Sequence, residues 1–127
     1  MLLHRHNLCL TLMGLGMRSF GLKTRSTITK GKSVKLAVEV VSTNWQDDYL
    51  MKAGEYEKLG IVEYWIIDYL GLGGKRFIGS PKQPTLSIYQ MVDSEYEVKI
   101  FRGSDKIESS IFSELNLTAE QIFNRGR

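Results

Sequence analysis

The regular spacing of hydrophobic positions is clearest between residues 34 and 68. Residues 34–41 are apolar almost without interruption and rich in β-branched side chains, which predicts a strand that is covered on both faces. Apolar side chains then recur at helical spacing along 45–59, which predicts a helix that ends at Gly60. A second apolar strand is expected over residues 61–68. Together these segments predict a βαβ unit with parallel strands.

The second half of the chain predicts antiparallel structure and one short helix. Residues 70–84 form a loop rich in glycine and proline. Two alternating segments, 85–91 and 96–101, flank the tetrapeptide Val92–Glu95, which predicts a β-hairpin. Residues 105–109 can add a short strand. A last helix is expected with Thr118 and Gln121 as its capping box. The predicted fold class is therefore α/β, or mixed α+β.

Residues 1–30 differ from the rest of the chain in charge and in patterning. They carry five basic residues and no acid, whereas the other residues include 12 basic and 14 acidic side chains. The net charge of +3 therefore comes from residues 1–30, whereas acidic residues outnumber basic ones in the rest of the chain. It is weak evidence that the folded part binds nucleic acid. A secretory signal, a native element of the domain and a leader outside the core are three interpretations. The poor periodicity favours the leader, so we assign residues 1–25 to an unpatterned leader and 26–127 to the domain.

Composition limits the compartment and the number of domains. A chain of 127 residues with 43% hydrophobic residues can form one domain with its own core. The single cysteine, Cys9, cannot form an internal disulfide, and a reducing, cytoplasmic compartment is the simplest interpretation. No apolar run approaches the roughly 18–20 residues of a membrane helix, so no membrane partner is expected.

An acidic residue lies inside the first apolar strand. Glu39 shares a strand face with Ala37 and Val41, where a carboxylate is costly unless something pairs with it. Lys52 lies on the following helix and can reach back over the strand. The spacing allows a structural ion pair, or a site in which Glu39 binds Mg²⁺ and Lys52 assists phosphodiester hydrolysis. The second interpretation needs another carboxylate, which we expect from an adjacent strand.

Other polar residues are weaker candidates for a site. Asp68 ends the second strand and can be a metal ligand or, more simply, a turn cap. Asp47 and Asp48 can bind a metal ion, but acids are common in the first turn of a helix. His4 and His6 have the spacing of a metal-binding pair, yet they lie in the leader, where chance is the simpler explanation.

The loop after the second strand combines glycines with basic residues. Three glycines precede Lys75, but no G-K-[ST] sequence follows, which argues against a phosphate-binding loop. Lys75, Arg76 and Lys82, together with Phe77, can contact a DNA backbone. The alternative is a solvated loop without a partner.

Three motifs stand in order along this part of the chain. They are an E-V-x-S strand end at Glu39–Ser42, a D-x-x-x-K-x-x-x-Y helix from Asp48 through Lys52 to Tyr56, and a (V/P)-E-Y-W-I-x-D strand at Val62–Asp68. Over about residues 26–123, the chain resembles the Uma-type restriction endonucleases of the PD-(D/E)XK nuclease superfamily. The ending FSELNLTAEQIF, residues 112–123, is also similar to the C-terminus of that family.

The resemblance implies a restriction-endonuclease-like core, with a central mixed sheet, that hydrolyses DNA with Mg²⁺. It makes Glu39 a metal-binding catalytic carboxylate and Lys52 the catalytic lysine. Family members carry a further metal-binding aspartate in a P-D dipeptide on an earlier strand, whereas no acid precedes Glu39 here.

We therefore expect the C-terminal part of such a domain, with DNA hydrolysis impaired or lost. Missing neighbour strands would leave a sheet edge prone to self-association, and a homodimer is one possible result. The alternative is a non-catalytic remnant or interaction module of the same fold.

Overall fold

The computed structural model describes residues 22–23 and 35–125 of the chain. The strands are β1 (Leu22–Lys23), β2 (Leu36–Val40), β3 (Glu63–Asp68), β4 (Thr85–Val92) and β5 (Glu95–Phe101). They form one sheet with the order β1-β2-β3-β4-β5. The first three strands are parallel, and β4 is antiparallel to both β3 and β5. The predicted βαβ unit, hairpin and mixed-sheet fold class are thus confirmed.

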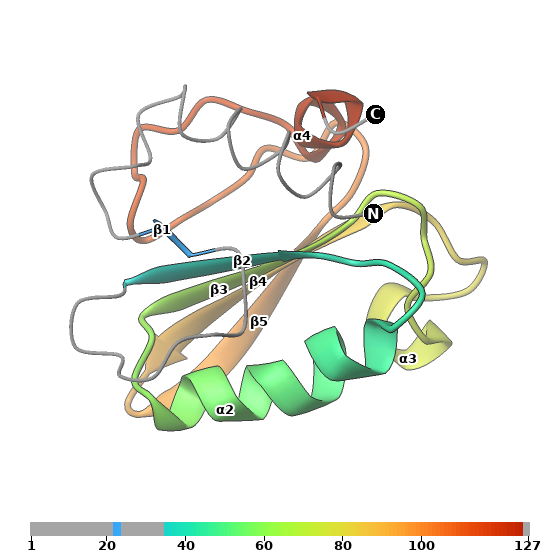
Figure 1. The fold of residues 1–127 in the computed structure, drawn as a ribbon. Helices are drawn as coiled ribbons and strands as arrows, with labels where there is room; N and C mark the ends of the chain where they lie inside the picture. Colours follow the sequence, from blue (N-terminus) through green and yellow to red (C-terminus); the bar gives the residue numbers. More distant parts are fainter. Residues whose placement is uncertain (1–21, 24–34, 126–127) are drawn as a thin grey trace.

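Helical segments cover both faces of the sheet (Figure 1). On one face lies the helix that joins β2 to β3, with a π-helical part, η2 (Asp47–Lys52), and an α-helical part, α2 (Ala53–Lys58). On the other face lie α4 (Ala119–Arg125) and the segment that leads to it. No helix of the described residues is long and apolar enough to cross a bilayer.

The alternation of side chains along β2 divides the core between the two faces. Leu36, Val38 and Val40 pack in the cluster that includes the buried residues of α4. Ala37 and Val41 pack in the cluster beneath η2 and α2. Because every residue of β2 is buried, the strand is covered on both faces, as its nearly continuous apolarity predicted.

The helix between β2 and β3 ends at Gly60, as expected. Gly60 has a φ of 75°, a conformation that only glycine adopts without strain. Its N–H donates to the carbonyl of Glu57, and the N–H of Ile61 donates to the carbonyl of Tyr56. These two hydrogen bonds form a Schellman motif, which directs the chain from the helix into β3.

Two further local predictions are confirmed in the second half of the chain. Asp93 and Ser94 both have positive φ and form the two-residue turn between β4 and β5. Thr118 and Gln121 exchange hydrogen bonds between their side chains and backbone N–H groups at the start of α4, as a capping box requires.

The structure departs from the predictions in two connecting segments. The loop after β3 contains one short helix, α3 (Lys75–Ile78), which the sequence pattern did not predict. Residues 105–109 do not form a strand, although Lys106 and Thr118 make an isolated bridge. β1, which falls within the proposed leader, pairs with β2. The leader boundary at residue 25 stays a prediction, because the other residues before 35 lie outside the described part.

Glu63 anchors the segment before α4 to the sheet, although this segment forms no strand. This buried carboxylate accepts hydrogen bonds from Trp65 Nε1 at 2.6 Å and from Ser109 Oγ at 2.5 Å. It also accepts hydrogen bonds from the backbone N–H and the hydroxyl of Ser110, at 3.0 and 2.7 Å. One acid of β3 therefore fixes a segment that is 46 residues distant in the sequence.

We expect Glu63→Ala to lower the free energy of unfolding by about 3 kcal/mol, because it removes a buried carboxylate that accepts four hydrogen bonds and leaves the buried Trp65 N–H without its acceptor. Urea denaturation measures the change. Glu108→Ala is the matched control, since the Glu108 side chain is 72% exposed, and it should change stability by no more than about 0.5 kcal/mol. Equal losses in the two variants would show that the Glu63 contacts contribute nothing to stability.

Tyrosine burial makes the fold sensitive to alkaline pH. Burial raises the pKa of five tyrosines, and it raises that of Tyr89 to about 12; the others are Tyr49, Tyr56, Tyr64 and Tyr96. Between about pH 10 and these higher values, only the unfolded chain loses the phenolic protons. The contribution to stability is therefore complete below about pH 10 and is lost as the pH rises.

We expect Tyr89→Phe to reduce this alkaline loss of stability. Between about pH 10 and the Tyr89 pKa of about 12, the free energy of unfolding should fall less steeply than in the wild type, by about 1.4 kcal/mol per pH unit. Urea denaturation at a series of pH values measures both slopes. Parallel slopes would contradict the assignment of a raised pKa to Tyr89.

Candidate active site

Glu39 lies near the carboxyl end of β2 and is fully buried. Its strand-face neighbours Ala37 and Val41 belong to the core beneath η2 and α2. The carboxylate therefore points toward the face of the sheet that η2 and α2 cover. β2 and β3 are parallel, so their carboxyl ends lie side by side at the same end of the sheet. Ligands of open α/β sheets bind beyond the carboxyl ends of the strands, so Glu39 lies close to the usual position of a ligand site.

Lys52 reaches Glu39 from the helix. Its Nζ lies 3.3 Å from Glu39 Oε1 and 3.2 Å from Asp48 Oδ1. The structure thus brings together the acid and the lysine that the sequence singled out. It adds Asp48 as a second acid at the same ammonium group, so this second carboxylate comes from the helix and not from an adjacent strand.

The π-helical geometry of η2 helps to explain why Asp48 faces inward. A π-turn holds more residues than an α-turn and therefore rotates the side chains around it. Both Asp48 and Tyr49 are buried in η2, although only Tyr49 fits the apolar stripe expected of an α-helix. The sequence signal that could have identified Asp48 as a partner of Lys52 is their i,i+4 spacing, which places an acid and a base on the same side of a helix.

Two tyrosines hold the acids of this cluster in place. The Tyr56 hydroxyl donates to Glu39 Oε2 at 3.0 Å, and the Tyr64 hydroxyl donates to the backbone carbonyl of Asp48 at 2.9 Å. Burial, reinforced by the Glu39 charge, raises the pKa of Tyr56 well above its usual range. Tyr56 therefore keeps its proton and remains a donor. In the sequence, Tyr56 stood out only as the last residue of the helix motif and Tyr64 only as part of the strand motif, and neither had a predicted contact.

The cluster combines two negative charges with one positive charge. At an effective dielectric constant of about 20, opposite charges at the 3.3 Å of the Lys52–Glu39 pair attract each other by about 5 kcal/mol. Removing each ion from water costs several kcal/mol, so the attraction roughly offsets the burial of the charges. The remaining formal charge of these three side chains is −1, which favours an additional cation over an anion.

Asp68 and Asp47 have structural partners. Asp68 accepts hydrogen bonds from the backbone N–H groups of Leu72 and Gly73, both at 2.8 Å, and from the Tyr49 hydroxyl at 3.3 Å. It caps the turn after β3, in agreement with the simpler of its two interpretations. Asp47 accepts a hydrogen bond from the Asn44 side chain at 2.7 Å. His4 and His6 lie outside the described residues.

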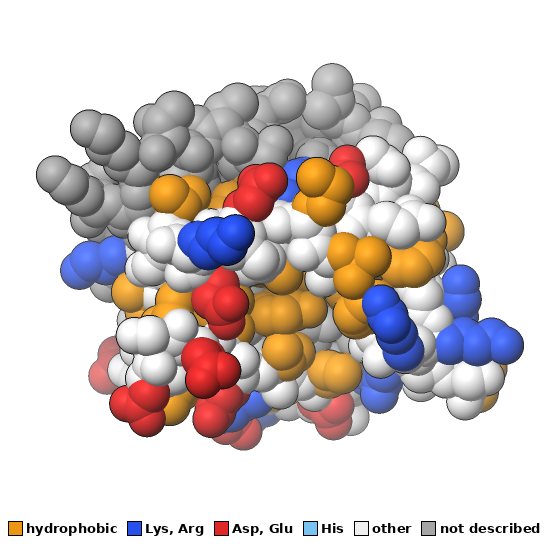
Figure 2. All heavy atoms as spheres, turned by 90° about the horizontal axis from the view of Figure 1, so that it is seen from below, with side chains coloured by type: hydrophobic (Ala, Val, Ile, Leu, Met, Phe, Trp, Pro, Cys, Tyr) orange, Lys and Arg blue, Asp and Glu red, His pale blue; other side chains and the backbone are white. Residues whose placement is uncertain are grey.

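The basic loop after β3 is attached to the start of the helix by aromatic side chains. The Phe77 ring stacks on Tyr49 with centroids 4.9 Å apart and contacts Trp45 edge to face. Lys75 and Arg76 are exposed on α3, the same short helix as Phe77. Figure 2, which shows the α2 side of the molecule, has basic side chains gathered at one end. This end of the molecule presents positive charge to solvent.

The glycines of this loop serve close packing. A Cβ atom on Gly73 would lie 2.8 Å from Tyr49 Cε2 and 3.0 Å from Asp68 Oδ2. The Gly73 N–H is already used by Asp68. The geometry thus agrees with the expectation that this loop is not a phosphate-binding loop.

Carboxylate oxygens are the donors that Mg²⁺ prefers, so Glu39 and Asp48 fit a hard divalent cation in chemical type. Mg²⁺ is commonly held by one or two carboxylates together with water and substrate phosphates. Within the described residues, no three His, Cys, Asp or Glu side chains are grouped to hold a metal ion. The described part of the chain therefore supplies carboxylates of the right kind but not a complete protein cage.

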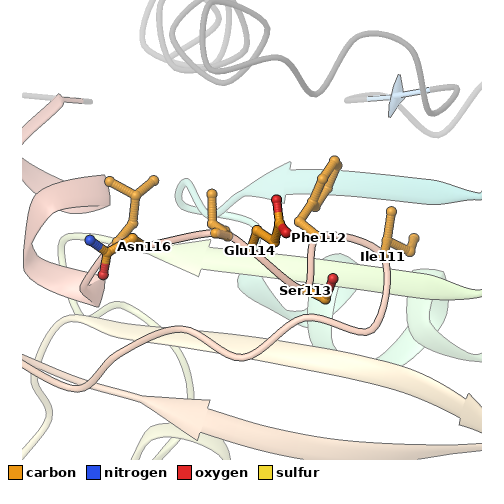
Figure 3. A pocket seen from close by; sticks show the side chains of 7 residues that line it. Ile111, Phe112, Ser113, Glu114 and Asn116 are labelled. Atoms are coloured by element: carbon orange, nitrogen blue, oxygen red, sulfur yellow. The ribbon is translucent and has the colours of Figure 1, made fainter.

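A separate hollow of about 500 Å³ lies against the segment before α4 (Figure 3). Residues 111–117 line it, and Glu114 is their only ionisable side chain. The hollow contains neither Glu39 nor Lys52, and it lacks the paired acid and base of the candidate site.

Comparison with known families gives one result that covers most of the chain. The model of the Uma2 family, described as putative restriction endonuclease, matches residues 21–120. No curated protein matches the chain significantly. The matched region contains the three motifs and the complete Glu39–Lys52–Asp48 cluster, and it confirms the resemblance seen in the sequence. The chain therefore belongs to the Uma2 family of putative restriction endonucleases, within the PD-(D/E)XK nuclease superfamily.

Proposed function

We propose that the chain hydrolyses DNA phosphodiester bonds with Mg²⁺, at a site formed by Glu39 and Lys52. The observation that carries the proposal is the position of the Lys52 ammonium, 3.3 Å from Glu39 at the carboxyl end of β2. Membership of a nuclease-like family supports the same reaction class. A structural ion pair alone does not account for the order and spacing of all three family motifs.

Each side chain of the cluster has a defined role in this proposal. Glu39 is the metal-binding carboxylate, and Tyr56 holds it in position through its other oxygen. A bound Mg²⁺ would supply an activated water and would stabilise charge on the phosphate. Lys52 positions the water or stabilises that charge, and Asp48 positions Lys52.

The proposed activity is slow. No acid precedes Glu39 in the sequence, so the aspartate of the family's P-D motif has no counterpart in this chain. Mg²⁺ would then depend more on substrate phosphates and water for its remaining ligands. Since a metal with fewer protein ligands is bound more weakly, we propose impaired hydrolysis at low metal concentration.

The basic loop provides the proposed contact with the DNA backbone. Lys75, Arg76 and Lys82 are exposed, and Phe77 fixes the loop against the start of the helix. Phosphate contacts of this kind position a nuclease on DNA without selecting a sequence. The single cysteine of the chain supports a cytoplasmic location for this activity.

A second candidate function is a non-catalytic interaction module of the same fold. The observation that favours it is the complete burial of Glu39, whose two oxygens already face Lys52 and Tyr56. In that case the cluster only joins the helix to the sheet. Metal binding and strand cleavage distinguish the two candidates.

We expect the wild-type chain to nick supercoiled plasmid DNA slowly with Mg²⁺ and to stop when EDTA is added. Glu39→Gln should lower the rate at least about 100-fold, because it removes the charged metal ligand. Lys52→Arg keeps the positive charge between the acids but changes its geometry, and it should lower the rate at least about tenfold. Glu108→Gln, at an exposed acid, is the control. Equal nicking by the wild type and Glu39→Gln would refute the proposed site.

We expect calorimetric titration to show Mn²⁺ or Mg²⁺ binding that depends on Glu39. Glu39→Gln should weaken that binding at least about tenfold, since a neutral amide is a poorer ligand for a hard cation. Circular dichroism confirms that the variant is folded, and Glu108→Gln again serves as the control. Absence of any metal binding to the folded wild type would favour the interaction module.

A further inference from the structure

β5 is the last strand of the sheet, and among the described residues no strand pairs with its outer edge. In an antiparallel pair, successive residues direct their backbone groups alternately toward and away from the neighbouring strand. The N–H of Tyr96 donates to Glu57 Oε2 at 2.7 Å, which shows that it points away from β4. By alternation, the backbone groups of Val98 and Ile100 also point outward.

The side chains of β5 alternate between apolar and charged. Val98 and Ile100 are 47% and 42% exposed, and they share a face with Tyr96. That face is on the α2 side of the sheet, because Tyr96 packs in the same cluster as α2; Figure 2 shows exposed hydrophobic side chains on this side. Glu97 and Lys99 are exposed on the opposite face.

We propose that this edge is a homodimer interface, at which β5 pairs antiparallel with β5 of a second copy about a two-fold axis at Val98. The register places Glu97 of each copy opposite Lys99 of the other. It also places Tyr96 opposite Ile100, and Val98 opposite its own counterpart. The outward backbone groups of Val98 and Ile100 and the carbonyl of Tyr96 then face those of the second strand. The N–H of Tyr96 joins this pairing only when it exchanges Glu57 Oε2 for the carbonyl of Ile100 in the second copy. This inference does not depend on the proposed nuclease function.

Charge selects this register over its neighbours. A two-fold axis at Glu97 or at Lys99 would place two like charges directly opposite each other, which is destabilising. An axis at Tyr96 would place Glu95 opposite Glu97. With the axis at Val98, Glu97 and Lys99 form two opposite-charge pairs. These pairs fall at non-hydrogen-bonded positions, where side chains of antiparallel strands lie closest together.

Apart from Glu57, which caps the N–H of Tyr96, the edge lacks the features with which proteins usually prevent such pairing. β5 is seven residues long, contains no proline and pairs with β4 residue by residue without a bulge. A lysine on an edge strand normally discourages association, but here Glu97 complements it. Lys99 has one intramolecular partner, Glu108, at 3.6 Å, and both side chains are at least half exposed. That pair contributes little, so exchanging it costs little.

Sedimentation equilibrium of the full chain tests the proposal. We expect a reversible dimer with a dissociation constant on the order of 10 µM, as is typical of a small interface. Glu97→Lys and Lys99→Glu should each weaken dimerisation at least about tenfold, because each variant places like charges opposite each other twice. Glu108→Gln should leave dimerisation unchanged.

Charge restoration separates specific pairing from a general loss of stability. An equimolar mixture of Glu97→Lys and Lys99→Glu should form a heterodimer, and the double variant should recover the wild-type affinity. Single variants that dimerise as well as the wild type would overturn the register. A wild-type chain that stays monomeric up to about 1 mM, far above the expected dissociation constant, would overturn the interface.

Discussion

The placement of Lys52 between Glu39 and Asp48 is the interaction on which the site depends. It connects the strand β2 to the helix η2 through charges that are almost completely removed from water. The attraction is large only because the dielectric is low, and the same burial makes each charge costly by itself. The three side chains therefore act as a unit. Changing one of them alters both the packing of the helix and the chemistry of the site.

β3 supports this unit from both sides of the sheet. Tyr64 holds the backbone of Asp48 on the face covered by η2 and α2, and Asp68 fixes the turn that leads to α3. Glu63 points to the opposite face and holds the segment that precedes α4. The (V/P)-E-Y-W-I-x-D motif thus contains two acids whose described contacts are structural. An acid in a nuclease-like motif need not belong to the catalytic site, and here the partners of the carboxylates distinguish structural acids from the candidate catalytic one.

The chemistry of the sheet edges differs from that of the centre. The central strands are apolar on both faces, and their few polar residues are held by hydrogen bonds or ion pairs. β5 instead alternates between apolar and charged side chains and exposes most of its residues. A strand with that pattern is stable at an edge without a second covering layer, and it remains able to pair with another strand.

The order of the central elements and the strand face of Glu39 follow from the amino-acid sequence alone. Strand alternation and helical spacing are local properties, and Gly60, Thr118 and Gln121 end or begin helices through nearby hydrogen bonds. Helical spacing also places Lys52 within reach of β2. Two other contacts are established by the folding of the chain: Asp48 pairs with Lys52 next to Glu39, and Glu63 binds Ser109 and Ser110. The first depends on a π-turn that changes the helical period, and the second on contacts between segments more than 40 residues apart. The Glu63 contacts leave no periodic signal along the chain. The i,i+4 spacing of Asp48 and Lys52 shows only that the two side chains can meet, and their burial against Glu39 arises when the helix packs on the sheet.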